Sequence, residues 1–439
     1  MFNFKRFFRK ALSLITLTAI LFCAVGCTAN PAPVDPGADP YQGAVKPAAI
    51  TAVNLMAGII SKNTATPVVP SESSSAKAAD FAVRLFKACF DEKGNTLVSP
   101  LSVLAALSMT ANGAQNETLH EMEAVLGMPL EQLNEFYFNY AAQLKDGEKA
   151  KLDLANSIWF TADERFTVNG DFLQKNADVF GADVYKAPFD DGTRQDVNNW
   201  VKEHTDGMIP EILGPDIDMN AAVMFLVNAL AFDAEWESVY HKDEVDKGEF
   251  TKEDGTKQNV ELMYSEEGDY LITDNAEGFI KTYKGGRYAF AALLPNEGVT
   301  VDELVASLDG EKLMGILNGA ANEGVRAAIP KFESEYSARL DDVLSAMGMP
   351  SAFKQEAAEF EGLGTSTAGN IFIDRVLHKT FISVDERGTR AGAATAVVMA
   401  DECAALTMHS VILDRPFVYM LIDTQTNLPF FIGTLTDVG

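Results

Sequence analysis

The most informative stretch of this sequence reads Val384-Asp-Glu-Arg-Gly-Thr-Arg-Ala-Gly-Ala-Ala-Thr-Ala-Val-Val-Met399. It directly follows a strand-like run at 381–385, yet it is longer and less polar than a loop that only connects two elements. Its alternate positions form a face that is small or apolar throughout: Thr389, Ala391, Ala393, Thr395, Val397 and Met399. Nothing on that face forbids burial between strands. The alternation therefore predicts a loop that can insert into a sheet as a strand.

The chain around this stretch shows helix and strand patterns in irregular order. Apolar spacing predicts helices at 81–87, 99–109, 118–126, 130–144 and 197–204, the second beginning with Ser99 as N-cap and Pro100 in its first turn. Alternating or continuously apolar runs predict strands at 152–160, 222–232, 279–294, 325–332, 381–385, 418–422 and 430–434. Because no βαβ rhythm is present, these patterns predict an α+β fold with large, mainly antiparallel sheets.

Composition and motifs narrow the function. The 439 residues include 63 acidic and 35 basic side chains, a net charge of −28, which disfavours nucleic acid as a partner. There is no G-x-S-x-G elbow, P-loop, dinucleotide-binding glycine motif or C-x-x-C, and the five histidines are scattered. We therefore expect neither enzyme activity nor a bound metal or cofactor. An exported hydrolase without a known motif is the remaining enzymatic alternative.

The N-terminus has the pattern of a bacterial export signal. Four basic residues within the first ten precede a 15-residue apolar run, which is too short for a membrane span. Gly26 directly before Cys27 resembles a lipobox, so we expect removal of residues 1–26 and lipidation of Cys27. An ordinary secretory signal is the alternative. The protein is then expected to be extracellular, anchored to the outer face of a bacterial cell membrane.

The expected domains are the signal (1–26), a linker rich in Pro, Ala and Ser (27–77) and one domain (78–439). Within the linker, residues 49–60 are more apolar than a tether requires. Two interpretations stay open for them: an apolar patch in a linker, or a segment that docks on the domain.

Several separated motifs lie in an order that resembles the serpin family over residues 78–438. They are Glu386-Arg-Gly-Thr389, Ser99-Pro-x-Ser102, Asn156-Ser-Ile-Trp159, Val197-Asn-Asn-Trp-Val201, Asn228-Ala-Leu-Ala-Phe232 leading to Trp236, Val376-Leu-His-Lys379 and Arg415-Pro-Phe-Val418. Each is weak alone, but their order and spacing together are specific.

The resemblance implies the serpin fold, with an exposed reactive-centre loop, and a monomeric suicide inhibitor of serine proteases, with cysteine proteases as a second target class. A protease cleaves the loop, and the loop then inserts into the main sheet and traps the enzyme. The implied sites are a hinge (Glu386, Gly388, Thr389, Arg390, Ala391, Ala393, Ala394), a polar shutter (Ser99, Ser102, Asn228, His378) and a breach tryptophan (Trp236). A serpin-fold binding protein that does not inhibit is the alternative.

The family's spacing also implies the bond that is cut. Fourteen positions after Gly388 lies Glu402, so the reactive bond is Glu402–Cys403 and a glutamyl protease is one target class. Its small neighbours suit elastase-like or subtilisin-like enzymes, with Ala400, Ala404 and Ala405 as alternative reactive residues. A trypsin-like target is disfavoured because no Lys or Arg lies between Ala391 and Asp414. No basic helix face is available for a heparin-type activator.

Overall fold

A computed structural model describes residues 50–144, 150–215, 217, 219, 223–389 and 409–439 of the chain. These residues all belong to one compact body. In this part of the chain, no helix combines the length and the apolar character needed to span a membrane. Cys27 and the signal segment lie outside the described residues.

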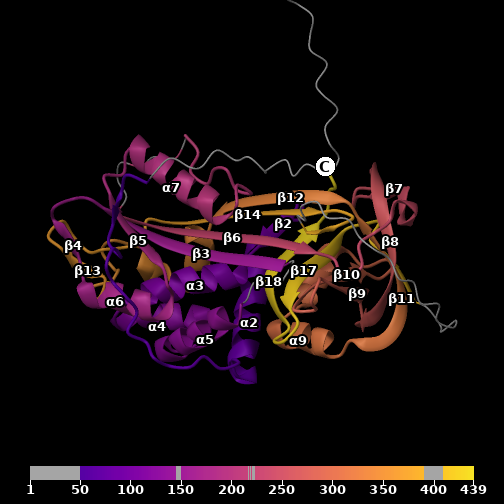
Figure 1. Cartoon of the computed structure of the whole chain (residues 1–439), viewed down its shortest axis with the longest axis horizontal. Helices are drawn as coiled ribbons and strands as arrows, with labels where there is room; N and C mark the ends of the chain where they lie inside the picture. The colour runs from indigo at the N-terminus through magenta and orange to yellow at the C-terminus, as the bar shows by residue number, and fades with distance from the viewer. Residues whose placement is uncertain (1–49, 145–149, 216, 218, 220–222, 390–408) are drawn as a thin grey trace, which may run out of the picture. The chain divides into compact units, whose positions relative to one another are not determined.

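Seven of the described strands form a first sheet, and the expected insertion site lies within it. Its order is β1-β5-β3-β6-β15-β14-β12, and Figure 1 shows β3, β6, β14 and β12 side by side. Strands β3 and β6 are antiparallel, whereas β6 and β14 run parallel. The strands are β1 (Val53–Asn54), β5 (Asp183–Ala187), β3 (Ala150–Thr161), β6 (Met224–Glu235), β15 (Gly388–Thr389), β14 (Arg375–Val384) and β12 (Phe332–Arg339).

A second sheet has nine described strands, in the order β16-β11-β8-β9-β10-β17-β18-β2, with β7 paired to β8. These strands are β2 (Thr96–Val98), β7 (Val245–Thr251), β8 (Lys257–Ile272), β9 (Ala276–Thr282), β10 (Tyr288–Pro295), β11 (Ala321–Pro330), β16 (His409–Ile412), β17 (Phe417–Asp423) and β18 (Leu428–Leu435). Strands β4 (Phe166–Val168) and β13 (Gly364–Ser366) form a separate pair.

Helices cover these sheets. They are α2 (Glu72–Cys89), α3 (Pro100–Ala111), α4 (Asn116–Leu126), α5 (Leu130–Gln143), α6 (Gly170–Val179), α7 (Asp191–His204), α8 (Val301–Ser307), α9 (Gly310–Asn318) and α10 (Asp341–Met347), with 3-10 turns at Lys242–Glu244 and Pro350–Phe353. With two large, mostly antiparallel sheets and these helices, the predicted α+β class is confirmed.

Strand β6 is covered on both faces, as its continuous apolar run predicts. Phe225, Val227 and Ala229 pack in one cluster with the apolar side of α7. Leu226 and Leu230, which point the other way, pack in a second cluster that includes α3. Figure 1 shows α7 and α3 on opposite sides of this strand. The centre of the first sheet is therefore out of contact with water.

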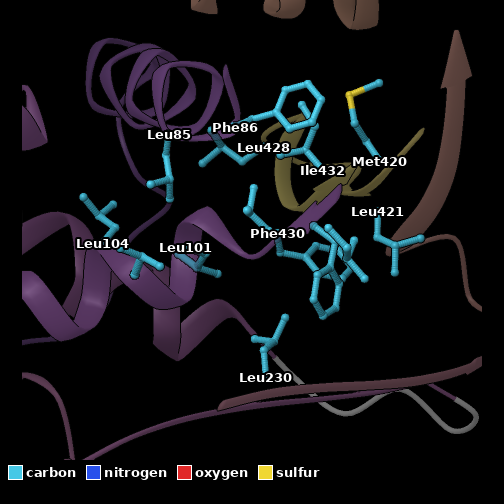
Figure 2. Close-up of a cluster of buried hydrophobic side chains, with 14 of the residues drawn as sticks. Leu85, Phe86, Leu101, Leu104, Leu230, Met420, Leu421, Leu428, Phe430 and Ile432 are labelled. Atoms are coloured by element: carbon cyan, nitrogen blue, oxygen red, sulfur yellow. The ribbon is translucent and has the colours of Figure 1, made fainter. Parts of the chain in front are cut away.

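The larger core fills the space between α2, α3 and the second sheet. Figure 2 shows how side chains from five elements meet there: Leu85, Phe86, Leu101, Leu104, Leu230, Met420, Leu421, Leu428, Phe430 and Ile432. Each of these residues is at most 6% exposed. At roughly 1.5–3 kcal/mol for each fully buried large apolar side chain, this cluster alone is a major source of stability.

Two of the predicted strands are each divided in the structure. The run 279–294 is a hairpin of β9 and β10, in which Gly285 and Gly286 adopt positive φ angles of 81° and 67°. The run 325–332 spans the end of β11 and the start of β12, and Lys331 separates the two. The first turn has a local signal that the single-strand prediction passed over, because Gly285-Gly286 between two strand-like runs is typical of a hairpin.

The first helix of the domain begins before residue 78, where we expected the linker to end. Helix α2 begins at Glu72, and Ser71 is its N-cap, accepting a hydrogen bond from the Ser74 amide at 3.2 Å. The serine-rich stretch that we expected to belong to the linker is thus a helix start, because Ser is a preferred N-cap residue.

The segment before this helix docks on the domain, as the second interpretation of residues 49–60 predicts. Val53 and Asn54 form β1, an edge strand paired with β5. The buried Asp196 carboxylate of α7 accepts hydrogen bonds from the Thr51 amide and hydroxyl and from the Ala52 amide, at 2.8–3.0 Å. Further along, the Val68 amide donates to the Asn139 side chain at 3.0 Å.

Candidate functional site: the hinge and the centre of the seven-stranded sheet

Strands β6 and β14 pair directly over only part of their length. Their register runs from Phe225–Arg375 to Ala229–Lys379 among the described residues. Toward the far ends of both strands, the two-residue strand β15 lies between them, antiparallel to each. The hinge segment, residues 385–389, thus enters the sheet at the position where a further strand could form.

Gly388 is required by close packing. A Cβ atom at this position would lie 1.9 Å from the carbonyl oxygen of Ala234 and 2.9 Å from Cα of Glu235, both in the backbone of β6. Any side chain would therefore push β15 off β6. Backbone freedom is not the reason for this glycine, since its φ is not in the left-handed region.

Trp236 holds the turn that precedes Gly388. Its indole Nε1 donates to the Asp385 carbonyl at 2.9 Å, and its amide donates to the Arg387 carbonyl at 2.7 Å. The Tyr240 amide donates to the Glu386 carbonyl at 2.9 Å. Three consecutive carbonyls of the turn are therefore bound by the segment that follows β6.

Thr389 is the first residue of the predicted face, and it is buried. Its Oγ1 is hydrogen-bonded to the Tyr283 hydroxyl, and the Tyr283 ring stacks on Trp236 with centroids 4.4 Å apart and planes 8° apart. Burial raises the pKa of Tyr283 well above its usual value, so its hydroxyl stays neutral. The hinge is anchored by its side chain as well as its backbone.

Glu386 has an ionic partner outside the sheet. Its carboxylate is paired with Lys331, which also contacts Glu261 at 2.9 Å. The side chains of Lys331 and Glu386 are partly exposed, so the pair adds modestly to stability.

A row of polar side chains crosses the sheet below the hinge. Asn156 of β3, Asn228 of β6 and His378 of β14 are register partners and so lie on one line. Asn228 Nδ2 donates to Asn156 Oδ1 at 2.7 Å, and Asn228 Oδ1 accepts from Ser102 Oγ of α3. His378 Nδ1 lies 3.0 Å from the same Asn228 oxygen. The shutter network is therefore continuous across three strands and a helix.

Ser99 takes part through its backbone. Its amide donates to His378 Nε2 at 3.1 Å, whereas its hydroxyl makes no cap for α3 and has no partner in the structure. Because Nε2 accepts this bond, Nδ1 carries the ring proton and donates it to Asn228 Oδ1. The imidazole is therefore neutral, and its burial lowers the pKa of His378 to about 4.

The comparisons with known proteins agree with this geometry. A family model described as serpin (serine protease inhibitor) matches residues 76–438. The chain belongs to the serpin family.

The similar structures include the thermophilic serpin tengpin. Its native state is 46% identical with a TM-score of 0.84, covering 88% of this serpin and 99% of tengpin. Its latent state is 45% identical with a TM-score of 0.74, covering 85% and 100%. Among the curated relatives, the leukocyte elastase inhibitor of Homo sapiens is 26% identical over 378 residues, covering 82% of this chain and 98% of that protein. The described fold of this serpin is thus more similar to the native state of tengpin than to its latent state.

Part of the predicted site of this serpin lies outside the described residues. This applies to Arg390, Ala391, Ala393 and Ala394 of the hinge, and to the reactive residues Glu402, Cys403, Ala400, Ala404 and Ala405. Within the described part of the chain, no group of three or more His, Cys, Asp or Glu side chains is placed to hold a metal ion.

The site also contains residues that the sequence analysis did not single out. Asn156 lay in a motif, but its place in the shutter follows only from the pairing of β3 with β6. Tyr283, Tyr240 and Lys331 are distant in sequence from the hinge. Tyr283 follows β9, Tyr240 follows β6, and Lys331 precedes β12, which pairs with the end of β14. No local sequence pattern distinguishes them.

The neutral state of His378 predicts how this serpin responds to acid. Its folded pKa of about 4 is below the unfolded value of about 6.5, so the unfolded chain binds the proton first as the pH falls. Native stability should therefore fall between about pH 7 and pH 4, by roughly 3 kcal/mol from this group. Urea unfolding of the wild type and of His378→Gln across this range measures it.

Since the carboxylates of both proteins titrate alike, the difference between the two unfolding curves isolates the histidine. We expect the advantage of the wild type to shrink toward acid pH. A difference that stays constant from pH 7 to 4.5 would contradict a buried neutral His378.

Proposed function

We propose that this serpin is a suicide inhibitor of serine proteases. A protease cleaves the reactive-centre loop and forms an acyl-enzyme, and the loop then inserts between β6 and β14. The enzyme is carried along and distorted before the ester is hydrolysed. Insertion and hydrolysis compete, so the fate of the protease depends on their relative rates.

One observation supports this proposal more than any other. Gly388 and Thr389 already lie between β6 and β14, in register with both. The first step of strand addition is thus made before any cleavage, and the predicted inward face continues with small residues. A Pro or an inward-facing charge through Met399 would obstruct the path, and the sequence has neither.

For the target we propose an elastase-like, subtilisin-like or glutamyl protease. The spacing from Gly388 favours cleavage at Glu402–Cys403, while Ala400, Ala404 and Ala405 suit enzymes with small apolar pockets. The name of the similar human leukocyte elastase inhibitor is consistent with the first of these classes.

The test is to mix residues 28–439 with one protease of each class and run denaturing gels. We expect a complex that resists denaturant, and a released C-terminal peptide whose mass identifies the cut bond. Cleavage without a complex at any enzyme ratio would instead support a serpin-fold binding protein that acts only as a substrate.

We also propose that the protein is exported and lipid-anchored through Cys27, on the strength of the basic and apolar pattern before Gly26. In a bacterial host, labelled palmitate should enter the full chain but not the Cys27→Ala variant. Label in both, or in neither, would overturn the proposal of a lipid anchor at this residue.

A further inference from the structure

A buried lysine lies beside the aromatic residues that hold the hinge. Lys281 of β9 is only 2% exposed, and its Nζ is 2.8 Å from Glu267 Oε1, whose side chain is 12% exposed. Lysine is almost never buried this far without a reason in the structure. The sequence offers no sign of it, because Lys281 lies in a run that is otherwise typical of a buried strand.

The ammonium group of Lys281 contacts two rings. Its Nζ is 4.5 Å from the centre of the Tyr240 ring and 5.5 Å from that of Trp236, both within the range of cation–π attraction. Such contacts are strongest where the cation is out of water, as it is at this position.

The carboxylate partner closes the cluster around Tyr240. Ser265 Oγ donates to Glu267 Oε1 at 2.6 Å, and the Tyr240 hydroxyl lies 3.2 Å from Ser265 Oγ. Lys281, Glu267 and Ser265 therefore hold Tyr240 at both its ring and its hydroxyl. We call these four residues, with Trp236, the breach cluster.

The breach cluster touches the hinge through its two aromatic residues. Trp236 and Tyr240 together bind the carbonyls of Asp385, Glu386 and Arg387, and Trp236 stacks on the Tyr283 ring that holds Thr389. A shift of either ring would therefore change the position at which β15 enters the sheet.

We propose that Lys281 is a positioning residue for loop insertion. Its charge, held by Glu267, keeps the Trp236 and Tyr240 rings where they bind the hinge, so that β15 is in place before the protease attacks. This role rests on the proposed inhibitory function. A hydrophobic side chain would fill the same volume, and a buried ion pair is a weak source of stability compared with such a replacement. The charge of Lys281 therefore acts on the positions of the two rings rather than on the stability of the domain.

The first test compares Lys281→Met and Lys281→Arg in residues 28–439. Without the charge, we expect insertion to slow by about 30-fold, the effect expected when a desolvated cation–π contact is lost. More protease then escapes, so the number of inhibitor molecules used per trapped protease rises. Lys281→Arg keeps the charge and should restore most of the trapping.

Lys281→Met leaves Glu267 buried without its partner and could fail to fold. The double variant Lys281→Met/Glu267→Gln removes both charges and avoids that outcome. The matched control is Lys252→Met, which removes a lysine paired with Asp437 at 2.7 Å, far along the chain from the hinge. We expect insertion to slow in the double variant and to keep the wild-type rate in Lys252→Met.

Trp236 provides a direct readout. The chain has three tryptophans, so Trp159→Phe/Trp200→Phe leaves Trp236 as the single emitter. In that background, the loss of the Lys281 charge should shift emission to the red and raise quenching by acrylamide in the uncut protein. A purely structural lysine would lower the unfolding midpoint and leave both signals unchanged.

The outcomes are distinguishable. Unchanged Trp236 emission and trapping in a folded double variant would overturn the role of Lys281. If the wild type traps no protease, the proposed function fails. The emission of Trp236 in the uncut protein still decides, in that case, whether Lys281 positions the breach cluster.

Discussion

Replacing Thr389 with arginine is expected to convert this serpin from an inhibitor into a substrate. Thr389 is 1% exposed, and its neighbours across β15 are Ala234 of β6 and Val384 of β14. An arginine would have to bury its charge without a partner, at a cost of several kcal/mol. At about 1.4 kcal/mol for each factor of ten, insertion should slow at least 100-fold. Hydrolysis of the acyl-enzyme is then faster than insertion, and the protease is released.

The measurement is the yield of denaturant-stable complex against the yield of cleaved, free inhibitor. Thr389→Ser retains the hydroxyl that contacts Tyr283, and Thr389→Val retains the volume, so both should still trap protease. Full complex formation by Thr389→Arg would contradict the assignment of residue 389 as the first inserted position.

Cleavage of the loop in the wild type is expected to raise its thermal stability sharply. In the described native structure, β15 contributes only two residues to the sheet, and β6 and β14 pair directly over five positions. A fully inserted strand would add roughly 20 backbone hydrogen bonds at about 1 kcal/mol each. For a domain of this size, that corresponds to a rise in the melting temperature on the order of 25 °C.

The experiment is to melt the protein before and after nicking it with a protease that leaves no complex, with mass spectrometry to confirm a single cut in the loop. Thr389→Arg serves as the matched control, because it can be cut at the same bond but should not insert. Its melting temperature is expected to stay near that of the uncut form. A wild type that melts lower after the cut would mean that the native sheet has no additional strand to gain.

Much of the fold could be predicted from local patterns. The run at 222–232 predicted a strand covered on both faces, and β6 has that burial. The order of motifs around Asn228, His378 and Gly388 predicted the family, which the match over residues 76–438 confirms. These features could be predicted because they depend on periodicity and spacing along the chain.

Other features depend on contacts between segments that are far apart. The run predicted as one strand from 279 is a hairpin turned at Gly285 and Gly286, and the serine-rich stretch at 71–75 begins a helix. Docking of the apolar segment 49–60 was one of two open interpretations, and it depends on an edge strand and on Asp196, which lies more than 140 residues away.

The sequence by itself was enough to place this chain among the serpins and to predict a loop that can insert, because the small residues that alternate after Gly388 are a property of one continuous segment. Only the tertiary structure decided how the hinge is held. The reason for Gly388 is the backbone of β6 at 1.9 Å, the tautomer of His378 depends on the Ser99 amide, and the charge of Lys281 faces two rings from other segments. Each is a contact across the sheets, and its energy depends on distance and burial that no single segment specifies.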